Sequence, residues 1–216
     1  GYFSSETMGE RGVETLGRRR AVFRYDFQED AIEGPLVSSD ISDVNSSTTA
    51  WRTHAVIGVS WDEERRHVEY FDPEFRELYE QLVGFFPESN VNIVSWDSEF
   101  RKVVINISGG HTSGAYYLID RVSGDVTLLA ASRPRIPEAA MAPVEIIHYT
   151  AQDGLALFGY LTLPPGRDAR DLPAVLLPHG GPEARDFYGV DPWAQFLAAR
   201  GYAVFQPQFR GSGGFG

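Results

Sequence analysis

The sequence predicts two parts of different fold class, an all-β part over residues 1–140 and an α/β part over residues 141–216. Three observations support this division. Short apolar or alternating runs bounded by Gly, Ser, Asp or Asn recur through the first part, as expected for β-strands. A proline-punctuated stretch over 133–143 then marks a change of texture. Beyond it, two fully apolar runs flank one helical pattern, which is typical of a parallel βαβ unit.

The first part contains several runs with the composition of short strands. These runs are 21–25, 55–59, 91–94, 103–107, 115–119 and 126–129. Between the last two, Gly124 is expected to take the positive φ that a tight hairpin requires. Four antiparallel strands over 91–129 match the size of one β-propeller blade, so we interpret residues 1–140 as propeller blades. A β-sandwich has similar strand spacing and is the alternative.

One helix is expected to interrupt these strands. Asp72 can accept hydrogen bonds from the free N–H groups of its first turn, and proline follows directly. Apolar residues at helical spacing (Phe75, Leu78, Tyr79 and Leu82) predict a buried face. Gly84 is expected to end the helix in a left-handed conformation.

The second part is expected to begin with an antiparallel pair, 144–149 and 155–163, joined by a turn at 152–154. The run 173–177 is apolar at every residue, as in a strand covered on both faces. Asp191 and Pro192 then predict a helix start, and Gly201 its end. The apolar run 202–205 follows, which completes a right-handed βαβ unit.

The first of these apolar strands leads into His179-Gly180-Gly181-Pro182. In α/β-hydrolases, a glycine-rich turn at this position donates a backbone N–H to the oxyanion of an acyl-transfer reaction. Glycine suits the task because a Cβ would keep the backbone away from the substrate oxygen. Gly180 and Gly181 are therefore the candidate oxyanion-hole residues. His179 is a candidate for orienting the turn, and Pro182 for stiffening its exit.

The segment "WAQFLAARGYAVFQPQFRGSGGFG" follows this turn and carries a distinctive order of residues. With it, residues from about 143 onward resemble the start of the catalytic domain of the prolyl oligopeptidase family, in particular its acylaminoacyl-peptidase-like branch. The upstream segment "YLIDRVSGDVTLLAASRP" resembles the closing blades of that family's propeller. The resemblance implies a serine peptidase that hydrolyses short peptides after the propeller has screened them. It also implies a supporting loop at Arg210-Gly211-Ser212 near the site.

The nucleophile of this family stands in a Gly-x-Ser-x-Gly sequence that follows the "RGSGGFG" loop, with Asp and His further on. We therefore expect the catalytic triad to lie beyond Gly216, and the 216 residues alone to be inactive. Ser60 lacks the second glycine of the pattern and Ser212 has the wrong spacing. Three alternatives stay open: a propeller-based binding module without activity, a degenerate hydrolase homologue, and a carboxylesterase with a similar His-Gly-Gly turn.

Composition limits the partners and the location of the protein. The net charge of −11 argues against nucleic acid and anionic membranes, whose phosphates the chain would repel. The absence of cysteine excludes thiolate metal sites and suits a reducing, cytoplasmic compartment. We expect no metal and no cofactor, because serine hydrolases need none. Exposed sheet or propeller edges are expected to promote self-association.

Overall fold

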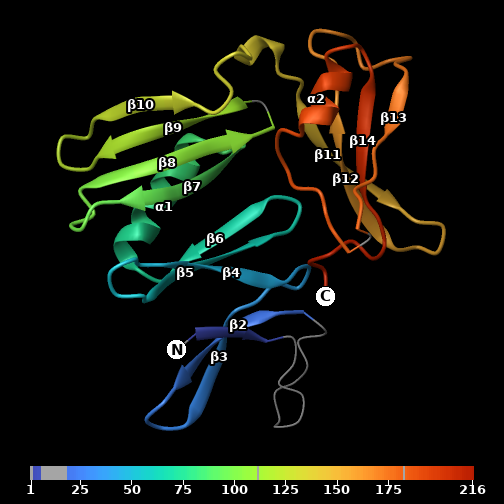
Figure 1. Cartoon of the computed structure of the whole chain (residues 1–216). Helices are drawn as coiled ribbons and strands as arrows, with labels where there is room; N and C mark the ends of the chain where they lie inside the picture. The colour runs from blue at the N-terminus through green and yellow to red at the C-terminus, as the bar shows by residue number, and fades with distance from the viewer. Residues whose placement is uncertain (1, 6–18, 111, 182) are drawn as a thin grey trace. The chain divides into compact units, whose positions relative to one another are not determined.

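The computed structural model describes residues 2–5, 19–110, 112–181 and 183–216. The chain forms two compact units. The first unit contains the described residues up to Glu77, together with Gly180–Phe187 and Gly211–Gly216. The second contains Leu78–His179 and Tyr188–Arg210. Figure 1 shows the course of the chain through both units.

The first unit is built from two three-stranded antiparallel sheets. One contains β1 (Tyr2–Ser5), β2 (Ala21–Asp26) and β3 (Ala31–Val37), and the other contains β4 (Val44–Thr49), β5 (Val56–Asp62) and β6 (Arg66–Tyr70). Four buried valines, Val22 and Val37 from the first sheet with Val44 and Val59 from the second, form one cluster. The sequence predicted β2 and β5 but missed the other four strands.

Helix α1 (Pro73–Phe85) begins where its cap predicted. Asp72 Oδ1 accepts hydrogen bonds from Glu74 N at 2.9 Å and from Phe75 N at 3.3 Å. Of the predicted buried face, Phe75, Leu78 and Leu82 are buried and Tyr79 is half-buried. The prediction for Gly84 was wrong: the helix continues through this residue to Phe85, and φ at Gly84 is not in the left-handed region. The helical hydrogen-bond pattern extends beyond Gly84, since Phe86 N donates to Leu82 O.

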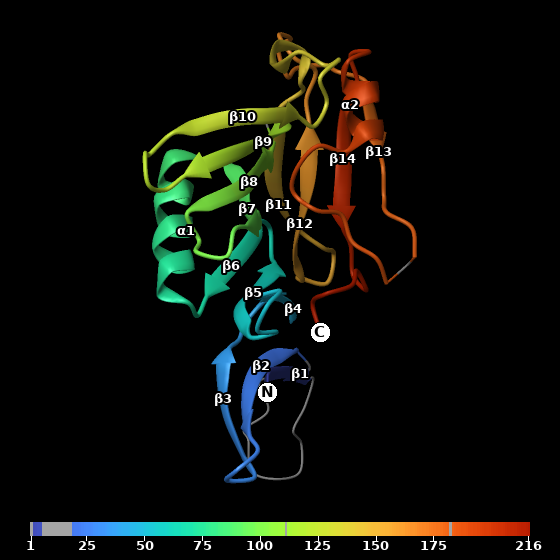
Figure 2. The same ribbon diagram turned by 60° about the vertical axis from the view of Figure 1, so that its left-hand side comes forward.

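The second unit contains a four-stranded antiparallel sheet in the order β10-β9-β8-β7, seen from another side in Figure 2. Its strands are β7 (Ser89–Trp96), β8 (Lys102–Gly109), β9 (Thr112–Asp120) and β10 (Val126–Ala131). Alternate residues of β8 are buried, and Val103 and Ile105 are among the most enclosed side chains of the chain. The predicted hairpin between β9 and β10 is confirmed, with φ of 80° at Gly124.

A mixed sheet in the order β11-β12-β14-β13 completes the second unit. It contains β11 (Val144–Thr150), β12 (Ala156–Thr162), β13 (Ala174–Leu176) and β14 (Ala203–Gln208). The predicted antiparallel pair and the parallel pairing of β13 with β14 are both present. Strand β13 differs from the prediction, since Leu176 is 67% exposed rather than covered on both faces. The reason is its position at the edge of the sheet, with β14 as its partner on one side.

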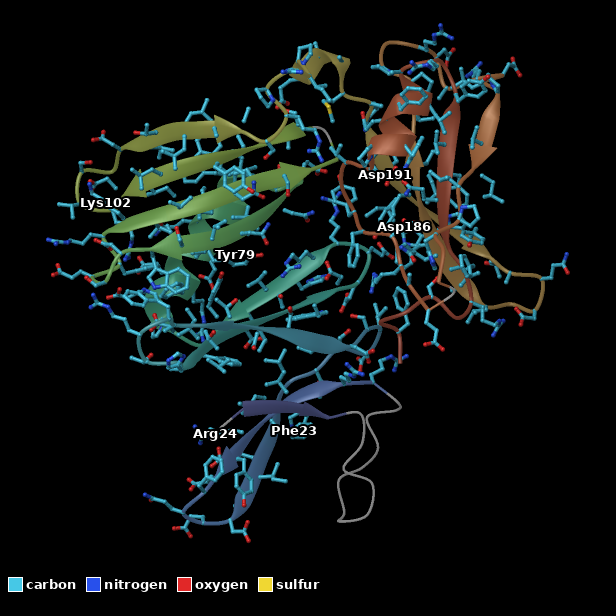
Figure 3. All side chains as sticks on the ribbon, viewed as in Figure 1. Phe23, Arg24, Tyr79, Lys102, Asp186 and Asp191 are labelled. Atoms are coloured by element: carbon cyan, nitrogen blue, oxygen red, sulfur yellow. The ribbon has the colours of Figure 1, made fainter. Side chains whose placement is uncertain are left out.

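Helix α2 (Pro192–Ala198) connects these two parallel strands. Asp191, labelled in Figure 3, caps it by accepting a hydrogen bond from Ala194 N at 2.8 Å. Gly201 follows the helix with φ of 96°, as predicted. The buried face of α2 consists of Ala194 and Ala198.

The two sheets of the second unit are joined around Tyr188, which is buried. Asn90 Nδ2 donates to the Tyr188 carbonyl at 2.9 Å, and the Tyr188 ring packs against Tyr160 with 6.1 Å between ring centroids. A Cβ at Gly110 would overlap the Tyr188 ring, so the ring can occupy this position only because Gly110 has no side chain. No helix in the described parts of the chain is both long and apolar enough to cross a membrane.

Candidate active site

His179 lies just beyond the carboxyl end of β13, where the sequence predicted the start of the site. Leu177 N donates to Phe205 O at 2.8 Å and extends the contact with β14. The His179 ring stacks on Phe209, with 4.3 Å between centroids and 19° between planes. Because the carboxyl ends of parallel strands meet at one edge of a sheet, these rings mark the edge at which α/β folds place their ligands.

The two candidate oxyanion residues differ in what surrounds them. Gly181 has φ of 128°, and a Cβ there would stand 2.7 Å from Ala184 N and 2.9 Å from Glu183 N. Only glycine fits this backbone without a shift. At Gly180, a Cβ would meet nothing within 4 Å. The turn itself therefore requires glycine at position 181, whereas at position 180 the argument for glycine concerns the approach of a substrate. Pro182 lies outside the described residues.

The residues after this turn pack against the glycine-rich end of the chain, within the first unit. Gly213 N donates to Ala184 O at 2.8 Å, and Asp43 N donates to Gly214 O at 2.9 Å. A Cβ at Gly213 would stand closer to the Glu183 carbonyl oxygen than real Cβ atoms come. The backbone of the predicted "RGSGGFG" loop thus packs directly against the backbone of residues 183–184.

Arg185 connects this packed segment to the turn between β5 and β6. Its two terminal nitrogens donate to the carbonyl oxygens of Asp62, at 2.8 Å, and Glu63, at 2.6 Å. The guanidinium carbon lies 4.4 Å from the ring centroid of Phe215 and 5.4 Å from that of Phe187. Forked hydrogen bonds and stacking on aromatic faces are the contacts for which arginine is suited and lysine is not.

The acceptor turn is itself held by the Glu63 side chain. Glu63 Oε1 accepts hydrogen bonds from Ser39 Oγ at 2.6 Å and from Trp61 Nε1 at 2.9 Å, and His67 Nε2 lies 3.4 Å from Glu63 Oε2. Partial burial raises the pKa of the Glu63 carboxyl, but these two hydrogen bonds and His67 outweigh it, so the pKa lies below its usual value.

Arg210, predicted as a supporting residue, pairs with Asp153 in the turn between β11 and β12. Both side chains are exposed, so this ion pair adds little to stability. The structure places His179 and Arg210 in the second unit and Gly180 and Gly181 in the first.

The two serines that the sequence excluded as nucleophiles are also unsuited to nucleophilic attack in the structure. Ser60 and Ser212 are both buried, and Ser60 Oγ accepts a hydrogen bond from Arg66 at 2.7 Å. Across residues 2–5, 19–110, 112–181 and 183–216, no group of three or more His, Asp or Glu side chains could hold a metal ion.

Sequence reasoning passed over Arg185, the residue with the most specific contacts in this region. A signal was present, because Arg185 stands two residues before Phe187 in a segment that is otherwise acidic or apolar. Its acceptors, however, are 122 and 123 residues away along the chain, and no local pattern identifies them.

The fold defined by these sheets is shared by solved peptidases. No protein-family model matches the sequence. Dipeptidyl peptidase 4 of Porphyromonas gingivalis is similar with a TM-score of 0.64 and 18% identity, over 100% of this chain and 30% of that one. Acylaminoacyl peptidase of Pyrococcus horikoshii is similar with a TM-score of 0.54 and 17% identity, over 91% of this chain and 29% of that one. At these identities the likeness shows the fold alone.

Two curated proteins are also related in sequence. Dipeptidyl aminopeptidase BIII of Pseudoxanthomonas mexicana is 35% identical over 214 residues, which cover 94% of this chain and 30% of the relative. Dipeptidyl peptidase family member 6 of Caenorhabditis elegans is 32% identical over 163 residues, covering 66% of this chain and 22% of the relative. The chain thus spans less than a third of either relative. Its homologues and structural neighbours are dipeptidyl peptidases, prolyl endopeptidases and acylaminoacyl peptidases, which confirms the resemblance to the prolyl oligopeptidase family.

Proposed function

We propose that the chain is part of a serine peptidase of the prolyl oligopeptidase family. In this proposal residues 1–140 are closing blades of the β-propeller, and residues 141–216 are the first part of the α/β-hydrolase domain. The observation that carries the proposal is the 35% identity to a dipeptidyl aminopeptidase along 94% of the chain. The parallel pairing of β13 with β14, which helix α2 connects, supports the proposal, because hydrolase sheets are built from such crossovers.

The chemistry proposed for the complete protein is acyl transfer to serine. A serine outside this sequence attacks the peptide carbonyl, a histidine takes its proton, and an aspartate orients that histidine. Negative charge then develops on the carbonyl oxygen. Backbone N–H groups of the Gly180–Gly181 turn donate to this oxygen and stabilise the transition state more than the bound substrate. No cofactor takes part in these steps.

We propose release of dipeptides as the specific reaction, because the two sequence relatives described above are dipeptidyl peptidases by name. The alternative within the same family is removal of an acylated residue. The substrates are short peptides that reach the site past the propeller. The net charge of −11 disfavours nucleic acid or an anionic membrane as a partner. We also propose a cytoplasmic location, because a chain without cysteine suits a reducing compartment.

The test compares the complete protein, obtained by extending the reading frame past Gly216, with the 216 residues alone. We expect the complete protein to hydrolyse dipeptidyl p-nitroanilides faster than acetyl-aminoacyl p-nitroanilides, and to lose this activity after labelling by a serine-directed fluorophosphonate. We expect the 216 residues to show neither turnover nor labelling. A complete protein that folds but neither cleaves nor is labelled would contradict the proposal and favour a binding module.

We also propose that the 216 residues associate with copies of themselves through open sheet edges. Leu176 is 67% exposed on edge strand β13, and Leu128 is 57% exposed on edge strand β10. Exposed apolar edges promote pairing between chains. We expect light scattering to show oligomers, and Leu176→Lys to shift them toward monomer. A wild-type chain that stays monomeric at high concentration would contradict this part.

A further inference from the structure

Arg185 is held in a geometry that fixes the backbone around it. Its guanidinium donates to two consecutive carbonyls, Asp62 O and Glu63 O, and lies over the Phe215 ring. Two hydrogen bonds from one rigid planar group restrict rotation as well as distance. The arginine is half-buried, so water competes less for these bonds than at an exposed site.

The acceptors are positioned by contacts that do not involve Arg185. Strands β5 and β6 pair up to Asp62 and Arg66, and Glu63 N donates to Arg65 O at 3.0 Å. The Glu63 carboxylate is fixed in turn by Ser39 and Trp61. The turn therefore presents two carbonyl oxygens in a fixed orientation. This arrangement makes the β5–β6 turn an anchor rather than a flexible loop.

The connection from Arg185 back to the candidate oxyanion donors is short and crowded. Gly181 packs against Ala184 N and Glu183 N so closely that a Cβ would stand within 3 Å of both. In addition, Gly213 N donates to Ala184 O. A shift of Arg185 therefore moves residues 183–184, and these residues contact Gly181 directly.

We propose that Arg185 is a positioning residue for the reaction: by binding the β5–β6 turn it sets the orientation of the Gly180–Gly181 amides toward the developing oxyanion. This inference rests on the proposed peptidase function. It connects a turn of the all-β part to the transition state, although no residue of that turn reacts. Loss of the contact between Arg185 and the β5–β6 turn lowers kcat rather than raising KM, because the oxyanion hydrogen bonds form fully only in the transition state.

Arg121 offers a matched control. Its Nη1 donates to Phe100 O at 2.9 Å, and its guanidinium carbon lies 4.4 Å from the Phe100 ring centroid. It thus makes the same two kinds of contact as Arg185, but it lies in the second unit, on a hairpin that contains neither Gly180 nor Gly181. Arg121→Lys measures what the loss of such contacts does to folding alone.

The experiment introduces Arg185→Lys and Arg121→Lys separately into the complete protein. For Arg185→Lys we expect kcat for a dipeptidyl p-nitroanilide to fall about 100-fold, with KM changed by less than about threefold, since small displacements of catalytic groups have effects of this size. The affinity for a peptidyl trifluoromethyl ketone, which forms an oxyanion on the enzyme, should fall in parallel. For Arg121→Lys we expect kcat and inhibitor affinity to stay within about twofold of wild type.

Amide hydrogen exchange of Gly180, Gly181, Glu183 and Ala184 provides a readout that does not depend on activity. In Arg185→Lys these amides should exchange at least about tenfold faster than in wild type, while in Arg121→Lys they should not. Unchanged exchange in Arg185→Lys, or a rise in KM with kcat preserved, overturns the inference. If Arg185→Lys fails to fold, Phe215→Leu removes the stacking partner alone and must give a smaller change in the same direction. Wild-type protein without peptidase activity contradicts the proposed function, and the exchange data still decide whether Arg185 fixes the turn.

Discussion

Two kinds of turn in this chain are held in different ways. The hairpin between β9 and β10 is closed by its own residues: Asp120 accepts hydrogen bonds from Val122 N at 3.0 Å and Ser123 N at 3.2 Å, and Gly124 takes the positive φ. The turn after β13 is instead held by Arg185, whose acceptors are more than 100 residues away in the sequence. The first turn is a local structure. The second depends on the tertiary fold, so a change at a distance can move it.

The same contrast appears in two carboxyl groups, that of Asp120 in the β9–β10 hairpin and that of Glu63 in the β5–β6 turn, which Arg185 binds. Hydrogen bonds from the backbone of Ser123 and Val122 lower the pKa of Asp120, which lies in the turn it closes. Hydrogen bonds from Ser39 and Trp61 lower the pKa of Glu63, against the opposing effect of partial burial. Both carboxylates stabilise a turn, but Ser39 lies 24 residues from Glu63 in the chain.

The largest difference between the two turns is expected on replacing their glycines. Gly181→Ala should lower the free energy of unfolding by about 3 kcal/mol, because the new Cβ meets the backbone and φ is unfavourable. Gly124→Ala should cost about 1 kcal/mol, because φ is left-handed but the surrounding space is open. Urea denaturation of the complete protein measures both. Gly180→Ala serves as a control that should leave stability nearly unchanged, and equal effects at positions 181 and 124 would remove the distinction.

A smaller effect is expected at a local feature of the crossover, the cap of α2. Asp191→Ala removes the hydrogen bond to Ala194 N and should cost about 1 kcal/mol, whereas Asp191→Asn keeps an acceptor and should cost much less. The comparison of the two variants by urea denaturation isolates the cap. If Asn and Ala are equally destabilising, Asp191 acts through its charge and not as a local cap.

Sequence predicted several local features correctly, although the helix end expected at Gly84 was wrong. The cap at Asp191, the helix end at Gly201 and the hairpin at Gly124 each depend on residues within one turn of the chain, and all three are present. Strands β3 and β4 were missed because they have no alternating apolar pattern: β3 contains Gly34 and Pro35, and β4 is mostly Ser and Thr. Their pairing is decided by neighbouring strands. For the same reason His179, Gly180 and Gly181 could be selected from a local motif, while Arg185 could not.

The smallest expected effect concerns how the stabilisation by Glu63, in the β5–β6 turn, depends on pH. The pKa of Glu63 is lower in the folded chain than its ordinary value. Its stabilising effect is therefore complete above the ordinary carboxyl range, near pH 4.3, and is lost as the pH falls through the folded value. We expect the stability difference between wild type and Glu63→Gln to be larger at pH 7 than at pH 3. Urea midpoints of both proteins at the two pH values measure it, and a difference that grows on acidification would reverse the assigned direction.

The most direct test of the central claim is a crystal structure of the complete protein with a peptidyl trifluoromethyl ketone bound to its serine. We predict that the oxyanion of the inhibitor accepts a hydrogen bond of about 2.7–3.1 Å from a backbone nitrogen of the Gly180–Gly181 turn, with Arg185 on the carbonyls of Asp62 and Glu63. An oxyanion bound entirely by other donors, with this turn remote from the inhibitor, would contradict the account.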